Sequence, residues 1–288
     1  MKAAAFNYQR VHSIQEALAL LANHGDNAKL IAGGQSLLPS LNMRLSNPEI
    51  LIDLQGIAEL KGITFEGSLV RIGAMTTHTE IQHSKIIQEQ LPLLTEAVPH
   101  IAHRAIRNLG TWGGSCVLGD PAAEWPACAV ALDAMMVIAG PKGQRKVAAK
   151  DFFLDLYTTA LQADEILVAS EFTITSAKRV HYFEELSRRH GDYAVTGLVC
   201  SLYLEQNKIT QSRFVYFSVA SIPLLAQGLQ SVLHNQSISD LSNPSLIAQA
   251  QHSVQAEIQT LSDLTNSAEM KKHLLGVLLE RAMKKLVS

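Results

Sequence analysis

The sequence predicts an α+β protein built from two domains. Helical and strand patterns alternate over residues 12–54, and a second mixed segment, which ends in three helical stretches, begins near residue 177. The chain has 288 residues, 47% of them hydrophobic, so it can bury a core in each of two ordinary domains. We therefore place one domain at residues 1–177, with subdomains of about 1–56 and 57–177, and a second at residues 178–288.

The charge balance excludes some functions. The chain carries 24 basic and 26 acidic residues, which gives no reason to expect nucleic acid or an anionic membrane as a partner. Its N-terminus lacks the pattern of a signal peptide, and no stretch approaches the roughly 20 apolar residues of a transmembrane helix. We expect a cytoplasmic protein without a membrane span.

The cysteines do not indicate a metal site. Cys116, Cys128 and Cys200 lack CxxC spacing, and they are fewer than the about four thiolates of an all-cysteine iron–sulfur cluster. His100 and His103 are three residues apart, but no third ligand is evident. We predict reduced, mostly buried thiols and no metal.

The first subdomain has the pattern of a small α/β unit. Ser13 and Glu16 form a capping box at the start of a helix, and Pro39 fits the first turn of a second helix. The pattern predicts helix, strand, helix and strand at residues 13–22, 28–32, 37–45 and 50–54.

The middle of the chain has shorter elements. The pattern predicts paired strands at residues 63–65 and 69–72, helices at 77–84 and 90–103, a buried apolar segment at 127–139 and a strand at 171–175.

The last hundred residues mix strands with long helices. Residues 193–204 fit either a helix leading into a strand or a strand throughout. Strands are predicted at residues 180–185 and 214–220, and helices at 224–233, 246–261 and 268–286. In the last helix one apolar stripe is expected to face the core or another subunit, and it consists of Met270, Leu274, Leu278 and Ala282.

The first glycine loop joins a predicted strand to a predicted helix. A loop of this kind presents free N–H groups at one point, and its glycines let a phosphate approach the backbone. Ser36 can add a hydroxyl donor. The sequence is neither GxGxxG nor a P-loop, so a tight turn without a ligand is an equally good interpretation. The loop consists of Gly33, Gly34, Gln35 and Ser36.

A second glycine loop follows roughly eighty residues later. Asp120 and Glu124 come shortly after it, and carboxylates beside a glycine loop suit ribose hydroxyls. Alternatively, Asp120 forms the turn before Pro121, and Glu124 is a solvated surface acid. Two such loops suggest one elongated dinucleotide held from two sides. The second loop consists of Gly110, Thr111, Trp112, Gly113, Gly114 and Ser115.

Five segments in this order resemble one family. They are KLIAGGQSLLP, AIRNLGTWGGS, DPAAEWPA, DEILV and SRRHGDYA. The series resembles the FAD-binding medium subunit of molybdenum hydroxylases, which include carbon monoxide dehydrogenase, xanthine dehydrogenase and bacterial dehydrogenases of N-heterocycles. The resemblance implies a two-part FAD-binding domain of the p-cresol methylhydroxylase-like fold, followed by a smaller α+β domain.

The resemblance also implies which residues contact non-covalently bound FAD. Tyr193 would lie near the isoalloxazine, and Glu124, helped by Asp120, near the ribitol or ribose. The second glycine loop would contact FAD through Gly110 to Ser115. The remaining contacts would come from Lys29, Leu30, Ile31, Ala32, Gly33, Gly34, Gln35, Ser36 and Leu37 at the pyrophosphate, and from Ile101, Ala102, Ile166 and Leu167 at the adenine.

Two positions depart from the TIGGN form usual in that family. Trp112 replaces a smaller aliphatic residue, and Ser115 replaces asparagine. In the resembling family the position of Trp112 faces the flavin ring, so the indole is expected to stack on it. The alternative is a tryptophan packed in the core beneath the loop.

The resemblance further implies a place in a larger enzyme. A large subunit would carry molybdopterin, a small subunit two [2Fe–2S] clusters, and this chain would pass electrons from FAD to an external acceptor within a dimer of heterotrimers. The alternatives are a free-standing FAD-dependent oxidase or reductase, and a nucleotide-binding regulatory or assembly protein with no redox role. The substrate is not encoded in this chain under the first interpretation.

Overall fold

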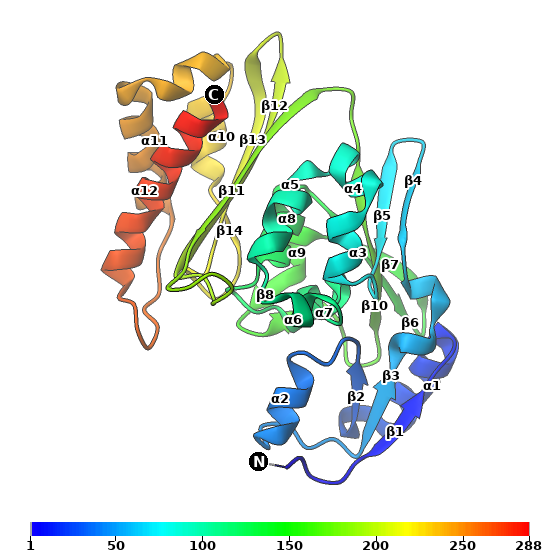
Figure 1. The fold of residues 1–288 in the computed structure, drawn as a ribbon. Helices are drawn as coiled ribbons and strands as arrows, with labels where there is room; N and C mark the ends of the chain where they lie inside the picture. The colour runs from blue at the N-terminus through cyan, green and yellow to red at the C-terminus, as the bar shows by residue number, and fades with distance from the viewer. Residues whose placement is uncertain (1, 288) are drawn as a thin grey trace.

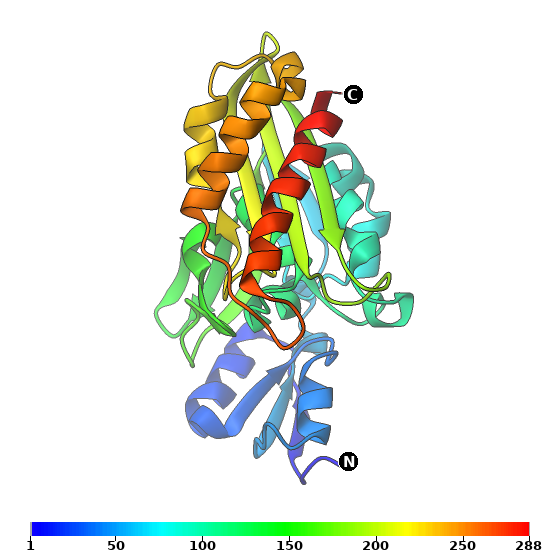
Figure 2. The same cartoon turned by 90° about the vertical axis from the view of Figure 1, so that its left-hand side faces the viewer.

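The computed structural model describes residues 2–287, which form three units, with the middle and C-terminal units side by side (Figure 1). The N-terminal unit lies at one end, and the chain terminates near the opposite end (Figures 1 and 2). The predicted α+β class is confirmed, since the chain contains both helices and strands, partly in separate runs such as α3–α8 and β11–β14. None of the helices within residues 2–287 is long and apolar enough to cross a membrane.

The N-terminal unit is a three-stranded parallel sheet with two helices. The strand order is β1–β3–β2, with β1 at Asn7–Arg10, β2 at Ala28–Ile31 and β3 at Ile50–Asp53. Helix α1 spans Ile14–His24, and α2 spans Leu37–Asn42, three residues shorter than predicted. The Ser13 hydroxyl caps α1 by accepting from the N–H of Glu16, but the Glu16 carboxylate accepts from His12 rather than from Ser13.

The middle unit is a five-stranded antiparallel sheet covered by short helices. The sheet order is β4–β5–β10–β6–β7, and the strands are Ile63–Glu66, Leu69–Gly73, Ile166–Thr173, Met135–Gly140 and Gly143–Ala148 in that order. After the last helix of this unit, the chain forms a hairpin of β8 (Phe153–Asp155) and β9 (Thr158–Thr159). The helices are α3 (His78–His83), α4 (Lys85–Gln90), α5 (Pro92–Ala97), α6 (Arg104–Arg107), α7 (Trp112–Leu118), α8 (Glu124–Ala131) and α9 (Ala149–Phe152).

The helix predicted at residues 90–103 is wrong, and prolines explain why. A proline disfavours helical geometry in the residue before it, and Leu91 accordingly separates α4 from α5, which begins at Pro92. Helix α5 ends at Ala97, and a 3₁₀ turn containing Pro99 follows. The segment after it leaves the helix, since Ile101 has an extended backbone.

The C-terminal unit is a four-stranded antiparallel sheet with helices on one face. Its order is β11–β12–β13–β14, with strands Lys178–Leu186, Thr196–Glu205, Lys208–Phe217 and Leu224–Leu225. Residues 193–195 are irregular and the strand begins at Thr196, so neither predicted alternative for 193–204 was complete. Helices α10 (Gln227–Leu233), α11 (Pro244–Glu257) and α12 (Ala268–Val287) lie side by side across the sheet (Figure 2).

The predicted apolar stripe of α12 is only partly core, and its second residue, Leu274, is half-buried. Leu278 and Ala282 are fully buried against the sheet, whereas Met270 in the first turn is 40% exposed. The three cysteines are free and buried, as predicted.

The middle and C-terminal units share a polar clamp within an apolar junction. Helices α5 and α8 pack on the face of the C-terminal sheet opposite α10–α12 (Figure 1). Arg213 of β13 is buried at this junction and donates from Nε and Nη2 to the carbonyl of Val130, at 3.1 and 2.8 Å. Its Nη2 also lies 3.1 Å from Asp133. The cation thus satisfies the carboxyl end of α8, where the helix dipole favours positive charge.

Replacing Arg213 with methionine should loosen this junction. The substitution leaves the buried carbonyl of Val130 without its donor, at a cost of about 2–3 kcal/mol. The melting temperature should fall by roughly 5 °C for a chain of this size. Arg281→Met is the control, because Arg281 is half exposed and pairs with Glu184 at the surface. Equal melting temperatures for the two variants would contradict a clamping role for Arg213.

Candidate functional site

The two glycine loops touch each other. A Cβ added to Gly33 would lie 1.9 Å from the carbonyl oxygen of Leu109, so the first loop rests directly on the segment that starts the second. A Cβ added to Gly114 would lie 3.7 Å from the Cβ of Ala32. The structure therefore joins two motifs that are far apart in the sequence, where the N-terminal unit meets the middle unit.

The first loop carries a row of unused backbone donors. The N–H groups of residues 33–37 make no hydrogen bond within residues 2–287. The Gln35 side chain donates to the carbonyl of Gly33 at 2.9 Å and folds the turn, in which Gly34 has a φ of +71°. Unpaired N–H groups at the start of a helix attract an anion, so the loop has the chemistry to hold a pyrophosphate.

The two glycines of the first loop were expected to make room for a phosphate, and the structure gives other reasons for them. The space that a Cβ would take at Gly33 is filled by protein, and at Gly34 it adjoins the side chains of Leu38 and Ile31. Gly33 is therefore required by the contact between the loops. Gly34 is required by its positive φ, which is rarely adopted by residues with a Cβ.

Most backbone N–H groups of the second loop already donate hydrogen bonds within the protein. The Thr111 hydroxyl caps α7 by accepting from the N–H of Gly114 at 3.1 Å. The N–H groups of Trp112 and Gly113 donate to the carbonyls of Thr76 and Ala74. The Ser115 hydroxyl makes no hydrogen bond within the described chain and is free for a ligand.

His78, which the sequence did not single out, holds the second loop from below. Its backbone N–H donates to the carbonyl of Gly110, and its Nδ1 accepts from Nε1 of Trp125 at 2.9 Å. Burial, and then the charge of Arg107, lower the pKa of His78 to about 3, so the ring is neutral and acts as an acceptor. A lone histidine in the sequence gave no signal of this role.

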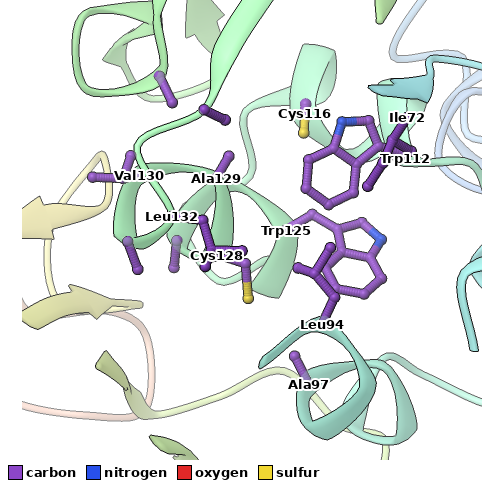
Figure 3. Packing of buried hydrophobic residues seen from close by; sticks show 14 of the residues in the cluster. Ile72, Leu94, Ala97, Trp112, Cys116, Trp125, Cys128, Ala129, Val130 and Leu132 are labelled. Carbon is purple, nitrogen blue, oxygen red and sulfur yellow. The ribbon is translucent and has the colours of Figure 1, made fainter. Parts of the chain in front are cut away.

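Trp112 is a core residue, and the prediction that it stacks on a flavin is wrong. Its side chain is fully buried, and its Nε1 donates to the Ser170 hydroxyl at 2.8 Å. The indole packs against Trp125, with ring centroids 5.2 Å apart (Figure 3). It also meets the ring of Phe172 edge-on. The indole therefore packs on the apolar sheet beneath the loop and does not face the candidate ligand site.

The four residues expected at the adenine differ in accessibility. Ile166 and Leu167 are core residues of β10, only 1% and 3% exposed, so a contact with the adenine would come from their backbone. Ala102 is half-buried and has a φ of +43°, beside Ile101. Arg107 fixes this bend, since its Nη1 donates to the carbonyls of Ile101 and Ala102 at 2.9 Å. The bend and the start of β10 both remain predicted contacts.

The two acidic residues occupy different environments. Asp120 is buried and its Oδ1 accepts from the N–H of Ala122 at 2.9 Å, as the turn-forming alternative expects. Glu124 begins α8, and its carboxylate makes no hydrogen bond beyond its own backbone amide among residues 2–287. Burial, followed by the charges of Glu185 and Asp120, raises the pKa of Glu124 to about 8. Glu124 is thus no solvated surface acid.

Tyr193 stands beside these carboxylates and is 74% exposed. Partial desolvation of the phenol, and then the charge of Asp120, raise the pKa of Tyr193. Tyr193 also forms part of the wall of a cavity of about 530 Å³ between the middle and C-terminal units, together with Pro121, Leu156, Leu261 and Lys271. An exposed aromatic ring at such a junction is free to cover a planar ligand.

These features define the class of the protein. Two touching glycine loops with a row of free N–H groups, followed along the chain by the half-buried carboxylate of Glu124, fit a dinucleotide with a pyrophosphate at its middle. Residues 4–172 match the family model described as FAD binding domain in molybdopterin dehydrogenase, and residues 181–286 match the CO dehydrogenase flavoprotein C-terminal domain. The chain belongs to this family of FAD-binding subunits of molybdenum hydroxylases, as the sequence motifs predicted.

Relatives of known activity cover the chain almost completely. It is 36% identical to the carbon monoxide dehydrogenase medium chain of Hydrogenophaga pseudoflava, over 96% of each chain. It is 35% identical to subunit alpha of the 6-hydroxypseudooxynicotine dehydrogenase complex of Paenarthrobacter nicotinovorans, over 99% of this chain and 95% of the relative.

Solved structures share the whole fold. The carbon monoxide dehydrogenase of Hydrogenophaga pseudoflava that lacks the Mo-pyranopterin moiety has a TM-score of 0.94 at 36% identity, over 99% of this chain and 98% of that chain. Quinoline 2-oxidoreductase of Pseudomonas putida 86 has a TM-score of 0.92 at 33% identity, over 100% and 98%. The predicted FAD-binding domain followed by a smaller C-terminal domain is confirmed, and the chain is an oxidoreductase subunit.

Replacing Gly33 with alanine should separate the loops. A Cβ at that position collides with a backbone carbonyl, which moves only if the loop moves. We expect the FAD content of the purified protein to fall at least severalfold, with a loss of stability of about 1–3 kcal/mol. Gly67→Ala is the matched control, because Gly67 has a φ of +60° and open space around its Cβ position. Full FAD content in Gly33→Ala would contradict the importance of this contact.

Replacing Trp112 with isoleucine should change stability and leave the flavin as it was. The variant opens a cavity beneath the second loop, at a cost of about 3 kcal/mol. Thermal unfolding measures that loss, and the fluorescence and absorbance of bound flavin check the site. A rise in flavin fluorescence in a folded, loaded variant would restore the stacking interpretation.

Proposed function

We propose that this chain is the electron-transfer subunit of a molybdenum hydroxylase, in which FAD receives electrons from partner iron–sulfur clusters and passes them to an external acceptor. The observation that carries the proposal is the contact between the two glycine loops, with the free N–H groups of residues 33–37 beside it. The match to subunits over nearly their full length supports the role of one subunit within a larger enzyme.

The residues present fit FAD as a non-covalent cofactor. The N–H groups of residues 33–37 and the Ser36 and Ser115 hydroxyls would hold the pyrophosphate, and the bend at Ala102 would contact the adenosine half. Glu124 would accept or donate a hydrogen bond at the ribitol, and Tyr193 would cover the ring. Bound FAD would supply a carrier that accepts electrons singly or in pairs. The three buried thiols favour non-covalent binding.

The proposal includes partner subunits. A large subunit would carry molybdopterin and oxidise the substrate, and a small subunit would carry two [2Fe–2S] clusters. Several relatives are named as medium chains or as subunits of larger enzymes, which supports this division. We propose a dimer of heterotrimers in the cytoplasm, where the three free cysteines would stay reduced.

The isolated chain and the native complex should behave differently. We expect the isolated chain to bind FAD and to release all of it on acid precipitation. Its chemically reduced flavin should pass electrons to an artificial dye, yet the chain should oxidise no aldehyde, purine, N-heterocycle or carbon monoxide. The natively purified protein should co-migrate with chains that contain iron and molybdenum.

Two results would contradict the proposal in different ways. Oxidation of an organic substrate by the isolated chain would favour a free-standing FAD-dependent oxidase or reductase. Absence of any flavin from the folded native protein would favour a regulatory or assembly protein with no redox role.

A further inference from the structure

Lys271 is a buried cation in the wall of the cavity that Tyr193 also lines. It lies in the first turn of α12 and is only 5% exposed. Its Nζ lies 2.8 Å from Oδ2 of Asp263 and donates to the carbonyl of Ser218 at 2.7 Å. A buried ammonium group is costly without such partners, so the two contacts hold the side chain in one position.

The carboxylate of Asp263 is itself fixed by the loop that precedes α12. Its Oδ1 accepts from the backbone N–H groups of Thr265 and Asn266 at 2.8 and 2.9 Å. The N–H of Leu261 donates to the carbonyl of Val219 at 2.8 Å, which ties the same loop to the chain just after β13. The ion pair therefore has a fixed anchor, and the ammonium group moves only if this anchor is broken.

Ser218 joins three segments of the chain. It follows β13 directly, is buried and has a φ of +61°. Its N–H donates to the carbonyl of Pro121 in the middle unit at 2.7 Å, and its hydroxyl donates to the carbonyl of Ala194. Its own carbonyl accepts from Lys271. A positive φ is unfavourable for a residue with a Cβ, so the three hydrogen bonds stabilise a conformation that serine rarely adopts.

The carbonyl of Ala194 is the point at which these hydrogen bonds reach Tyr193. The Tyr193 phenol makes no hydrogen bond within the described chain, and the residue is 74% exposed. The position of the ring therefore depends on the backbone that follows it. The hydroxyl of Ser218 fixes that backbone at Ala194. One residue further, the N–H of Val195 donates to the carbonyl of Leu186 at 2.7 Å.

We propose that Lys271 is a positioning residue for Tyr193, and that it acts through Ser218 to set the place of the phenol ring over the flavin. The inference rests on the proposed function, in which Tyr193 covers the isoalloxazine. Lys271 holds the carbonyl of Ser218, and the conformation so fixed directs the serine hydroxyl to Ala194. Loss of the ammonium group frees Ser218 to leave its positive φ. The bond to Ala194 then breaks, and the ring loses the fixed geometry that stacking on a planar ligand requires.

Fluorine NMR of the full chain without FAD tests the link between Lys271 and Tyr193. With fluorotyrosine in place of tyrosine, the Tyr193 resonance is the one that is missing from Tyr193→Phe. We expect it to shift in Lys271→Met, which keeps an unbranched side chain and removes the charge. Asp263→Asn keeps the turn and weakens the ion pair, so it should shift the resonance in the same direction. Lys284→Met removes an exposed cation of the same helix and should leave it unchanged. An unchanged resonance in folded Lys271→Met would overturn the proposal.

Ser218→Gly tests whether Lys271 acts through Ser218. Glycine accepts a positive φ and keeps the backbone bonds to Pro121 and Lys271, so only the hydroxyl bond to Ala194 is lost. The Tyr193 resonance should shift as it does in Lys271→Met. The double variant should show no further shift, because both substitutions break the same link. A wild-type resonance in Ser218→Gly, or fully additive shifts in the double variant, would contradict this route.

Fluorescence of bound flavin separates this inference from the proposed function. A tyrosine against the ring quenches flavin emission by electron transfer, so Tyr193→Phe should raise the emission severalfold. Lys271→Met should produce most of that rise in the wild type and none in the Tyr193→Phe background. A further rise in that background would overturn the positioning role.

Two other results concern the FAD site itself. Equal emission from the wild type and Tyr193→Phe would contradict the place of Tyr193 over the flavin, and with it the proposal. Absence of bound FAD from the folded chain would contradict the proposed function, while the fluorine resonance still decides whether Lys271 positions Tyr193.

Discussion

The contact between Gly33 and the carbonyl of Leu109 is the constraint on which the site depends. The distance allows no side chain at Gly33, so two loops from different units of the fold close into one surface. The free N–H groups of residues 33–37 then lie next to the start of α7 rather than in open solvent. Close packing, more than direct access for a phosphate, explains why glycine stands there.

A buried polar network beneath the second loop makes this contact rigid. His78 binds Gly110 through its backbone and Trp125 through its ring, and Trp112 is tied to Ser170. Each buried donor in these pairs has its acceptor, so movement of the loop would leave a polar group unsatisfied at a cost of about 1–3 kcal/mol. The two indoles also fill the space between the loop and the sheet (Figure 3). The loop is thereby pre-organised before any cofactor binds.

The C-terminal unit contributes charge as well as packing. Arg213 of β13 donates to the carbonyl of Val130 and so neutralises the carboxyl end of α8. The same helix begins at Glu124, a residue of the proposed FAD site. The C-terminal sheet therefore helps to fix a helix that carries part of that site.

The sequence by itself determined the α+β class, the order of most elements and the position of both glycine loops. These features are local: helical and strand periodicity, capping residues and glycine clusters are visible within about ten residues. The family motifs also predicted that the chain binds FAD. Tertiary structure decided the rest. It buried the side chain of Trp112, which local pattern could not distinguish from a ring that covers a flavin. It ended the predicted helix at residues 90–103, and it brought His78 beneath the second glycine loop. Each of these outcomes depends on packing between segments that are distant in the sequence, because burial and proton affinity are set by neighbours in space rather than by neighbours along the chain.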